Sequence, residues 1–264
     1  MNNSNFTLEI PGKILFSLAI ITLLLFQGWG QEQEIQRAKL YRDVFPLISD
    51  SDLYCSFFIM EEVNLDTRII GSEKEAERML MREHDIFYIN KGSADGIEIG
   101  QVFLILEIGP KINKYGHLAM KRGRAQVVAV EEKRASLRLE KSCEQVMTGY
   151  YLVPFEEKAS FLGKDLGYDI PIEESEGLEG SIIYTIREYN QIGRGHWALI
   201  DLGEEDGVQF GQQLIIYRGE AREEPVKGIG NLIIIDVQRK TSTVKILSAK
   251  DPLKVGDKVQ PHFK

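Results

Sequence analysis

Residues 88–101 read YINKGSADGIEIGQ, and residues 199–212 read LIDLGEEDGVQFGQ. The two stretches align without a gap, and both carry glycines and an Asp-Gly pair at the same places. The shared positions are Gly92, Asp95, Gly96 and Gly100 in the first copy and Gly203, Asp206, Gly207 and Gly211 in the second. Self-similarity of this kind predicts that the chain contains two copies of one module.

The match continues downstream of both stretches. Residues 123–140 align with residues 230–247, and Gly149–Pro154 aligns with Gly256–Pro261. Between the matched parts, the first copy is longer over Gly109 to Arg122, and we expect a surface loop there because loops tolerate insertions.

Each copy predicts short β-strands joined by glycine turns. Asp-Gly favours a tight turn because glycine accepts a positive φ, and the glycine before the shared glutamine lets the chain bend back into a strand. The expected strands are Val102–Ile108, Ala125–Val130 and Ala135–Leu139 in the first copy, and Gln213–Arg218, Leu232–Val237 and Thr243–Leu247 in the second, with a last strand ending at Pro154 or Pro261. The sequence therefore predicts a mainly β protein with two tandem five-to-six-stranded barrel- or sandwich-like modules.

The remaining segments set the expected domain limits. Residues 31–84 predict a minor α+β part, with a helix over Gln31–Phe45, strands at Leu53–Met60 and Thr67–Ile70, and a capped helix over Lys74–His84. The modules are expected at 85–155 and 181–264. Residues 156–180, rich in Glu and Gly, are expected to be a linker, with a strand at Ser181–Ile186 that joins the second module.

The N-terminus predicts export. The apolar run Ile14 to Phe26 is shorter than the roughly 20 residues of a bilayer-spanning helix, so it is typical of a secretory signal peptide. Gly28 and Gly30 are the small residues of a cleavage site, so residues 1–30 are expected to be removed and the mature chain to begin at Gln31. The alternative is an uncleaved segment that anchors the protein in the inner membrane, which would then be its only contact with lipid.

The net charge and the sequence motifs narrow the range of functions that we expect for this chain. The 32 Lys+Arg against 40 Asp+Glu give a net charge of −8, which disfavours binding to nucleic-acid phosphates. No nucleophile elbow, P-loop or zinc-protease motif is present, and the four histidines lack metal-ligand spacing, so no catalytic residue, metal or cofactor is expected. Asp95 and Asp206 could belong to calcium loops, but their equal place in both copies favours a turn.

The only two cysteines predict a disulfide between Cys55 and Cys143. An exported chain meets an oxidising compartment, where two thiols tend to be joined. Cys143 faces Lys250 in the other copy, so the module does not need a cysteine there for packing. Two separately buried thiols are the alternative.

Two apolar runs are candidate interaction edges. These runs contain Leu214, Ile215 and Ile216 in one strand and Leu232, Ile233 and Ile234 in another. An apolar strand needs either burial or a partner.

At these repeats the sequence resembles the C-terminal β-domain of bacterial flagellar assembly protein T, and related exported β-modules, some of which occur with peptidoglycan-binding LysM domains. The resemblance rests on residues 86–92 leading into Asp95-Gly96 and Gly100, on the same frame at Gly203, Asp206-Gly207 and Gly211, and on Gly256-Asp257. It implies an envelope scaffold or adaptor with a protein partner. No LysM segment is present, so the resemblance does not imply peptidoglycan binding. Binding of cell-wall glycan is nevertheless the second hypothesis for the function, and an unrecognised enzyme is the third.

Overall fold

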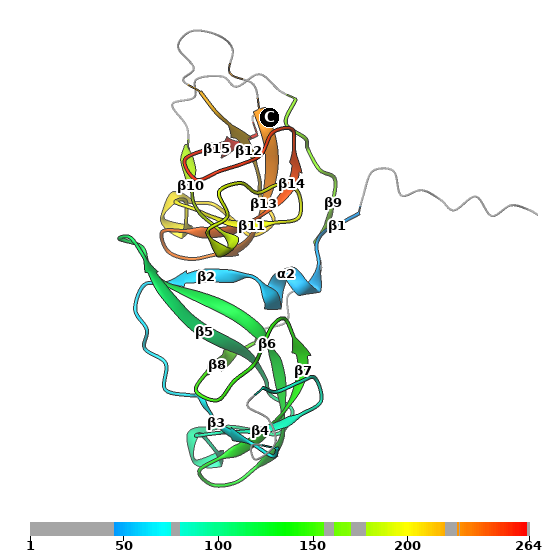
Figure 1. Cartoon of the computed structure of the whole chain (residues 1–264), viewed down its shortest axis with the longest axis vertical. Coiled ribbons are helices and arrows are strands. Elements are labelled where there is room, and N and C mark those ends of the chain that lie inside the picture. Colours follow the sequence, from blue (N-terminus) through cyan, green and yellow to red (C-terminus); the bar gives the residue numbers. More distant parts are fainter. Residues whose placement is uncertain are drawn as a thin grey trace, which may run out of the picture. The chain divides into compact units, whose positions relative to one another are not determined.

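The computed structural model describes residues 45–74, 80–155, 161–169, 178–219, 226 and 228–262 (Figure 1). The expected signal segment and residues 31–44 of the first expected helix lie outside the described residues. Within the described ranges, no helix has the length and apolar character needed to cross a bilayer.

The second module is a closed six-stranded antiparallel barrel. Its order is β10 (Gly180–Thr185), β11 (Trp197–Ile200), β14 (Ser242–Ala249), β13 (Gly228–Val237), β12 (Gln213–Tyr217) and β15 (Lys258–Pro261), which closes onto β10. Alternate residues point into the barrel, so that the side chains of Ile200, Leu214, Ile234 and Val244 form a fully buried core.

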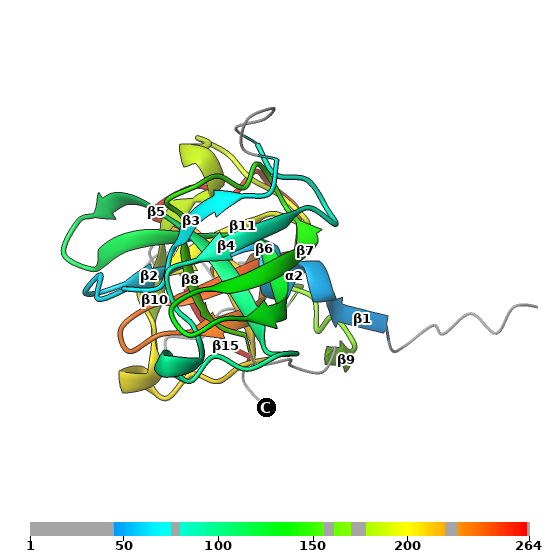
Figure 2. The same ribbon diagram turned by 90° about the horizontal axis from the view of Figure 1, so that it is seen from below.

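The first module has the same strand order. It runs β3 (Ile69–Ser72), β4 (Ile86–Ile89), β7 (Ala135–Ser142), β6 (Gly116–Val130), β5 (Val102–Ile112) and β8 (Tyr151–Pro154). A bridge between Arg68 and Tyr151 joins its two ends. Figure 2 shows these strands from below. The core of the module contains the buried side chains of Phe87, Ile105 and Leu137.

The mainly β fold with two barrel-like modules is thus confirmed, but the expected N-terminal α+β part is not. Strand β3 takes the place in the first barrel that β10 takes in the second, so the first module begins before residue 85. The repeated unit is longer in the structure than in the sequence alignment. Strands β3 and β10 share only a pattern of buried residues, so the alignment does not extend to them. Isolated bridges extend the correspondence, Met81 to Val146 in the first module and Ile192 to Leu253 in the second.

Both Asp-Gly stretches form the same one-turn 3₁₀ helix, η1 (Ser93–Asp95) and η3 (Glu204–Asp206). Asp95 accepts a hydrogen bond from the Gly92 amide at 3.1 Å, and Asp206 accepts one from the Gly203 amide at 2.9 Å. Gly96 and Gly207 follow with φ of 82° and 76°. Gly92 is needed for a different reason: a Cβ there would lie 2.3 Å from the Glu131 carbonyl oxygen in the neighbouring hairpin turn.

Replacing Gly96 or Gly207 by valine is expected to lower the free energy of unfolding by about 1–3 kcal/mol, because a β-branched residue resists positive φ. No heavy atom lies within 4 Å of a Cβ at either site, so backbone strain alone is measured. Urea denaturation checks this, with Gly193→Ala as the control, since that site is equally open and its φ is not positive. Variants that unfold with the parent would contradict the assigned role of the two turns.

The segment from Gly109 to Arg122 is not the expected loop. Strands β5 and β6 continue through it as a long hairpin that turns at residues 113–115, and β2 (Phe57–Met60) pairs with the outer part of β6. The first module therefore extends a three-stranded arm that the second module lacks. Sequence alignment showed only that residues were inserted, and their pairing partner lies outside the repeat.

The residues before the first barrel form a connecting segment, residues 45–60, made of β1 (Phe45–Ile48), α2 (Asp50–Cys55) and β2. The strand expected over Leu53–Met60 is wrong in its first half, because Ser49 and Asp52 cap a helix that continues to Cys55. The helix expected over Lys74–His84 is also wrong where it can be judged. Residues 80–84 form turns and the Met81 bridge, and residues 75–79 lie outside the described ranges.

The expected linker contains a strand. Within it, β9 (Phe161–Gly163) pairs antiparallel with β1. Residues 156–160 and 170–177, including most of the acidic stretch 173–179, lie outside the described residues. Glu179 accepts a hydrogen bond from the Tyr217 hydroxyl at 2.5 Å, so it belongs to the surface of the second barrel.

Candidate functional site

The two apolar runs expected to offer an interaction edge do not offer one. They lie in β12 and β13, and each of these strands is hydrogen-bonded on both sides within the closed barrel. Leu214, Ile216, Leu232 and Ile234 point into the barrel core. The outward-pointing Ile233 packs with Leu47, Ile48 and Leu53 of the connecting segment, and Ile215 packs under Tyr217, Val226 and Tyr168. The chain itself buries this apolar surface, so an external partner would have no access to it.

The eight turn residues likewise do not converge on one site. Gly92, Asp95, Gly96 and Gly100 belong to the first barrel, and Gly203, Asp206, Gly207 and Gly211 belong to the second. Among the described residues, no group of three or more His, Cys, Asp or Glu is placed to hold a metal ion. These positions shape the modules. Apart from Cys55 and Cys143, the residues that set the junction between the modules were not singled out from the sequence.

The predicted disulfide between Cys55 and Cys143 is confirmed, with Cα atoms 5.4 Å apart. It ties the end of α2 to the residue that follows β7, and so fixes the connecting segment to the first barrel. A disulfide that closes this part of the fold points to an oxidising, extracytoplasmic compartment.

The connecting segment is fixed to the second barrel by a buried carboxylate. Asp52 is 4% exposed, and it accepts hydrogen bonds from Lys245 Nζ at 2.6 Å and from the Trp197 indole N–H at 2.9 Å. Burial raises the pKa of Asp52, but hydrogen bonds from Lys245, Ser49 and Trp197 outweigh it and hold the pKa below its usual value. The carboxylate is therefore ionised and makes an ion pair with Lys245 of β14.

A second buried ion pair joins the barrels directly. Lys121 of β6 is 5% exposed, and its Nζ lies 2.6 Å from Asp236 Oδ2 of β13. Around these pairs, Phe57 and Leu118 pack with Leu199 of the second barrel. Buried ion pairs require accurate geometry, so together with this apolar layer they hold the two barrels in one arrangement. Figure 1 shows α2 and β2 between the modules.

A cavity of about 360 Å³ opens at this junction, and we call it the disulfide pocket. Its apolar lining includes Phe57, Met120, Tyr184 and Trp197, and the Cys55–Cys143 bridge forms part of its wall. Arg122 and Arg187 also line it, and both make ion pairs with Glu144. Burial raises the pKa of Glu144, but the two guanidinium groups lower this pKa by more than burial raises it. The carboxylate therefore stays charged between them.

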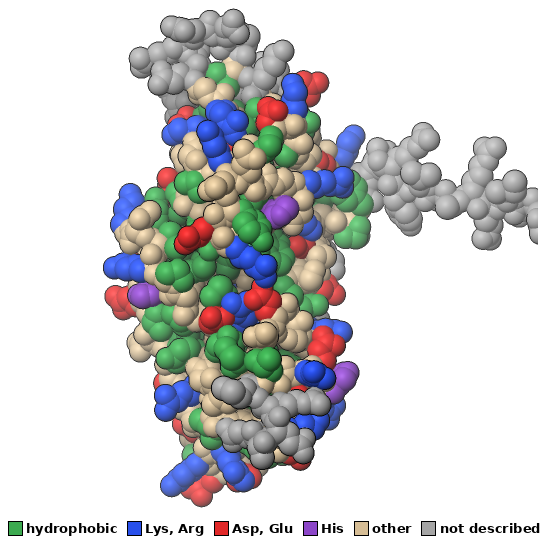
Figure 3. Space-filling model, viewed as in Figure 1, with side chains coloured by type: hydrophobic (Ala, Val, Ile, Leu, Met, Phe, Trp, Pro, Cys, Tyr) green, Lys and Arg blue, Asp and Glu red, His purple; other side chains and the backbone are tan. Residues whose placement is uncertain are grey.

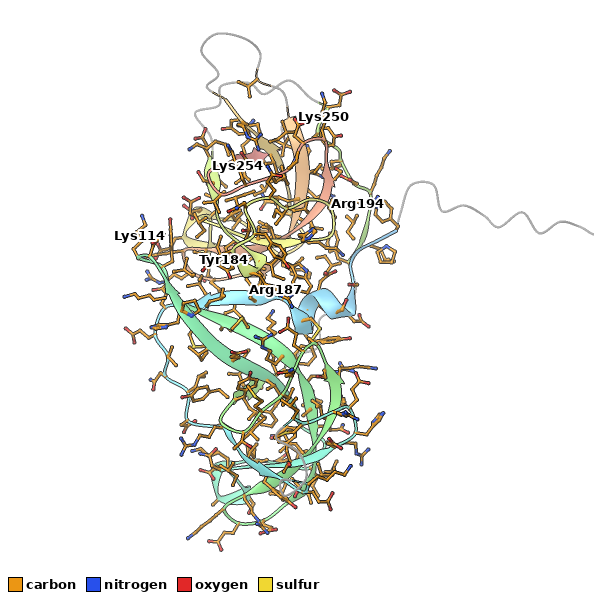
Figure 4. The ribbon with its side chains drawn as sticks, viewed as in Figure 1. Lys114, Tyr184, Arg187, Arg194, Lys250 and Lys254 are labelled. Atoms are coloured by element: carbon orange, nitrogen blue, oxygen red, sulfur yellow. A yellow bond between two sulfur atoms is a disulfide. The ribbon has the colours of Figure 1, made fainter. Side chains whose placement is uncertain are left out.

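A second hollow of about 520 Å³ shares Tyr184 with the disulfide pocket, and we call it the tyrosine groove. One wall comes from the arm of the first module, with Lys111 and Asn113, and the other comes from the second module, with Tyr184, Tyr189 and Lys254. In Figure 4 Tyr184 and Arg187 lie close to the connecting segment, while Lys114 marks the tip of the arm and Lys254 lies higher on the second module.

Backbone strain is concentrated at these two hollows. Four non-glycine residues in the described ranges have a positive φ, and three of them, Asn113, Arg187 and Glu188, line one of the hollows. In the same stretch, the Thr185 hydroxyl donates a hydrogen bond to the Tyr189 carbonyl at 2.6 Å. Residues held in such conformations are found mainly at functional sites, where the surrounding structure fixes them.

A long open strand edge is present on the arm of the first module. Strand β5 pairs with β8 only from Phe103 to Leu106, so residues 107–112 face no strand on that side in the described part of the chain. Pro110 lies in this stretch and has no N–H to donate, which makes the edge a poor template for an added strand. The hollows are therefore better candidates for binding than this edge.

Charged side chains of both signs are interspersed over the face that Figure 3 shows, without one large field of a single sign. Trp197 is half-buried and joins the junction through its hydrogen bond to Asp52. Apart from the capping box of Ser49 and Asp52, the residues of the junction carry no sequence motif. The other signal in the sequence was that Asp52 and Cys55 lie outside the repeat and have no counterpart in the second copy. No protein family and no curated protein matches this chain.

Proposed function

We propose that the chain is an extracytoplasmic, non-enzymatic scaffold or adaptor of the bacterial cell envelope, which presents the junction of its two barrels to a protein partner. The observation that carries the proposal is the fixed junction itself. Two barrels of one topology are joined by a connecting segment, a disulfide and two buried ion pairs, and a composite surface results that neither module has alone.

The disulfide pocket is the docking site in this proposal. Its apolar lining suits one or two apolar side chains of a partner segment, and Arg187 at its rim, 63% exposed, suits a carboxylate on the same segment. Apolar anchors surrounded by charged groups are the usual arrangement of a protein-binding hot spot. The resemblance to envelope β-modules supports the same class of function.

Site-specific photo-crosslinking tests the proposal. A photo-reactive phenylalanine at Ser51, an exposed residue on the pocket lining, is expected to give one discrete adduct in envelope fractions. The same group at Ile99, which is 71% exposed on a turn of the first barrel, is the control and is expected to give none. Arg187→Glu should abolish the Ser51 adduct by repelling the acidic segment. Equal adducts at both positions, or an adduct that Arg187→Glu leaves unchanged, would refute docking at this pocket.

A further inference from the structure

We propose that the tyrosine groove is a separate binding site for an acidic saccharide. This site goes beyond docking of a protein partner, and of its lining residues only Tyr184 also lines the disulfide pocket. The volume of about 520 Å³ lies within the roughly 300–1,000 Å³ that ligand sites of drug-like size occupy.

The aromatic residues provide the surface for sugar rings. Tyr189 is 45% exposed, and Tyr184 is half-buried in a T-shaped contact with Phe57 at a centroid distance of 5.5 Å. The Thr185 hydroxyl holds the Tyr189 backbone carbonyl by a hydrogen bond, so little backbone order has to be gained on binding. Exposed aromatic rings on an ordered backbone suit the apolar faces of sugars.

The polar groups provide the specificity. Asn113 and Asn190 offer amide donors and acceptors from opposite walls, which suits sugar hydroxyl and acetamido groups. Lys111 and Lys254 also lie on opposite walls, both are exposed, and neither makes an ion pair with a described residue. Glu188 is the acidic residue of the lining, so the two lysines give the groove a net positive charge. An acid group on the saccharide, a carboxylate or a phosphate, would lie between them.

Titration calorimetry of the full chain tests the proposal, with oligosaccharides of equal length as probes. An oligogalacturonate carries carboxylates, a glycerol-phosphate polymer with sugar substituents carries phosphates, and a chitin oligosaccharide is neutral. We expect an acidic probe to bind at least threefold more tightly than the neutral one, and this preference should fall as salt is raised. The two acidic probes distinguish the carboxylate source from the phosphate source.

Variants then assign the site. Lys111→Gln with Lys254→Gln should remove the preference for acidic probes, and Tyr189→Ala should weaken all probes. Lys133→Gln, an exposed lysine on a turn of the first barrel, is the matched control and should change nothing. Absence of saccharide binding, or acidic binding that the double lysine variant leaves intact, would overturn the proposal. The Ser51 crosslink reports protein docking independently, so failure of one proposal is distinguishable from failure of the other.

Discussion

Replacing Asp52 by alanine is expected to lower the free energy of unfolding by about 3–5 kcal/mol, because it leaves a partly buried lysine without its counter-ion. Lys245 is 19% exposed, and the Trp197 indole N–H would lose its acceptor in the same step. The connecting segment would then lose its ion pair with the second barrel, and the hydrogen bond from the Thr243 hydroxyl to the Phe57 carbonyl would remain. We expect Trp197 to become more exposed, with a red shift of its fluorescence.

Urea denaturation and fluorescence in a Trp29→Phe background check this expectation, since Trp197 is then the single tryptophan. Asp251→Ala, on an exposed turn, is the control. The sign of the pH dependence gives a second test. The pKa of Asp52 is lowered on folding, so its contribution is complete well above pH of about 4 and is lost as the pH falls through the folded-state value. Parent and variant should therefore converge in stability in acid, and a constant difference down to low pH would contradict the ion-pair explanation.

Removing the disulfide with Cys55→Ser and Cys143→Ser is expected to cost about 2–4 kcal/mol of stability, because it frees a chain separation of 88 residues in the unfolded state. Each barrel has its own core, and neither core contains a cysteine. The loss should therefore appear first as faster hydrogen exchange in α2 and β2, while the barrel strands remain protected.

Thermal unfolding of the double serine variant, compared with the parent under oxidising and reducing conditions, measures the effect. Reduction should destabilise the parent to the level of the variant and leave the variant unchanged. Thiol titration of denatured protein from the envelope should find no free thiol. Two free thiols in that protein would contradict both the disulfide and the extracytoplasmic assignment.

These two predictions concern residues of the same short helix, α2. Asp52 and Cys55 lie within one short helix, and they attach the connecting segment to different barrels, Asp52 to the second and Cys55 to the first. Since both hollows lie at this junction, a variant that loosens α2 should also weaken binding at the disulfide pocket. Ser51 crosslinking in the Asp52→Ala background measures that coupling.

The sequence by itself determined the modules. Gly92, Asp95, Gly96 and Gly100 recur as Gly203, Asp206, Gly207 and Gly211 because the same turn must form twice, and local backbone geometry depends on neighbouring residues alone. The strands around these turns, and the pairing of the only two cysteines, followed from local patterns and from composition. These features can be predicted without knowing which distant segments of the chain pack together.

Only the tertiary structure decided how these modules are used. The apolar runs around Ile215 and Ile233 looked like free edges, yet ring closure and the connecting segment bury them, and neither contact leaves a local sequence pattern. The extra residues of the first copy looked like a loop, and they became an arm because β2 was available to pair with β6. Lys121 and Tyr184 carry no motif, and the capping box of Asp52 with Ser49 marks only the start of a helix. They acquire their roles because long-range packing brings Lys245, Asp236 and the arm of the other module against them, and packing between distant segments is not encoded in any single stretch of chain.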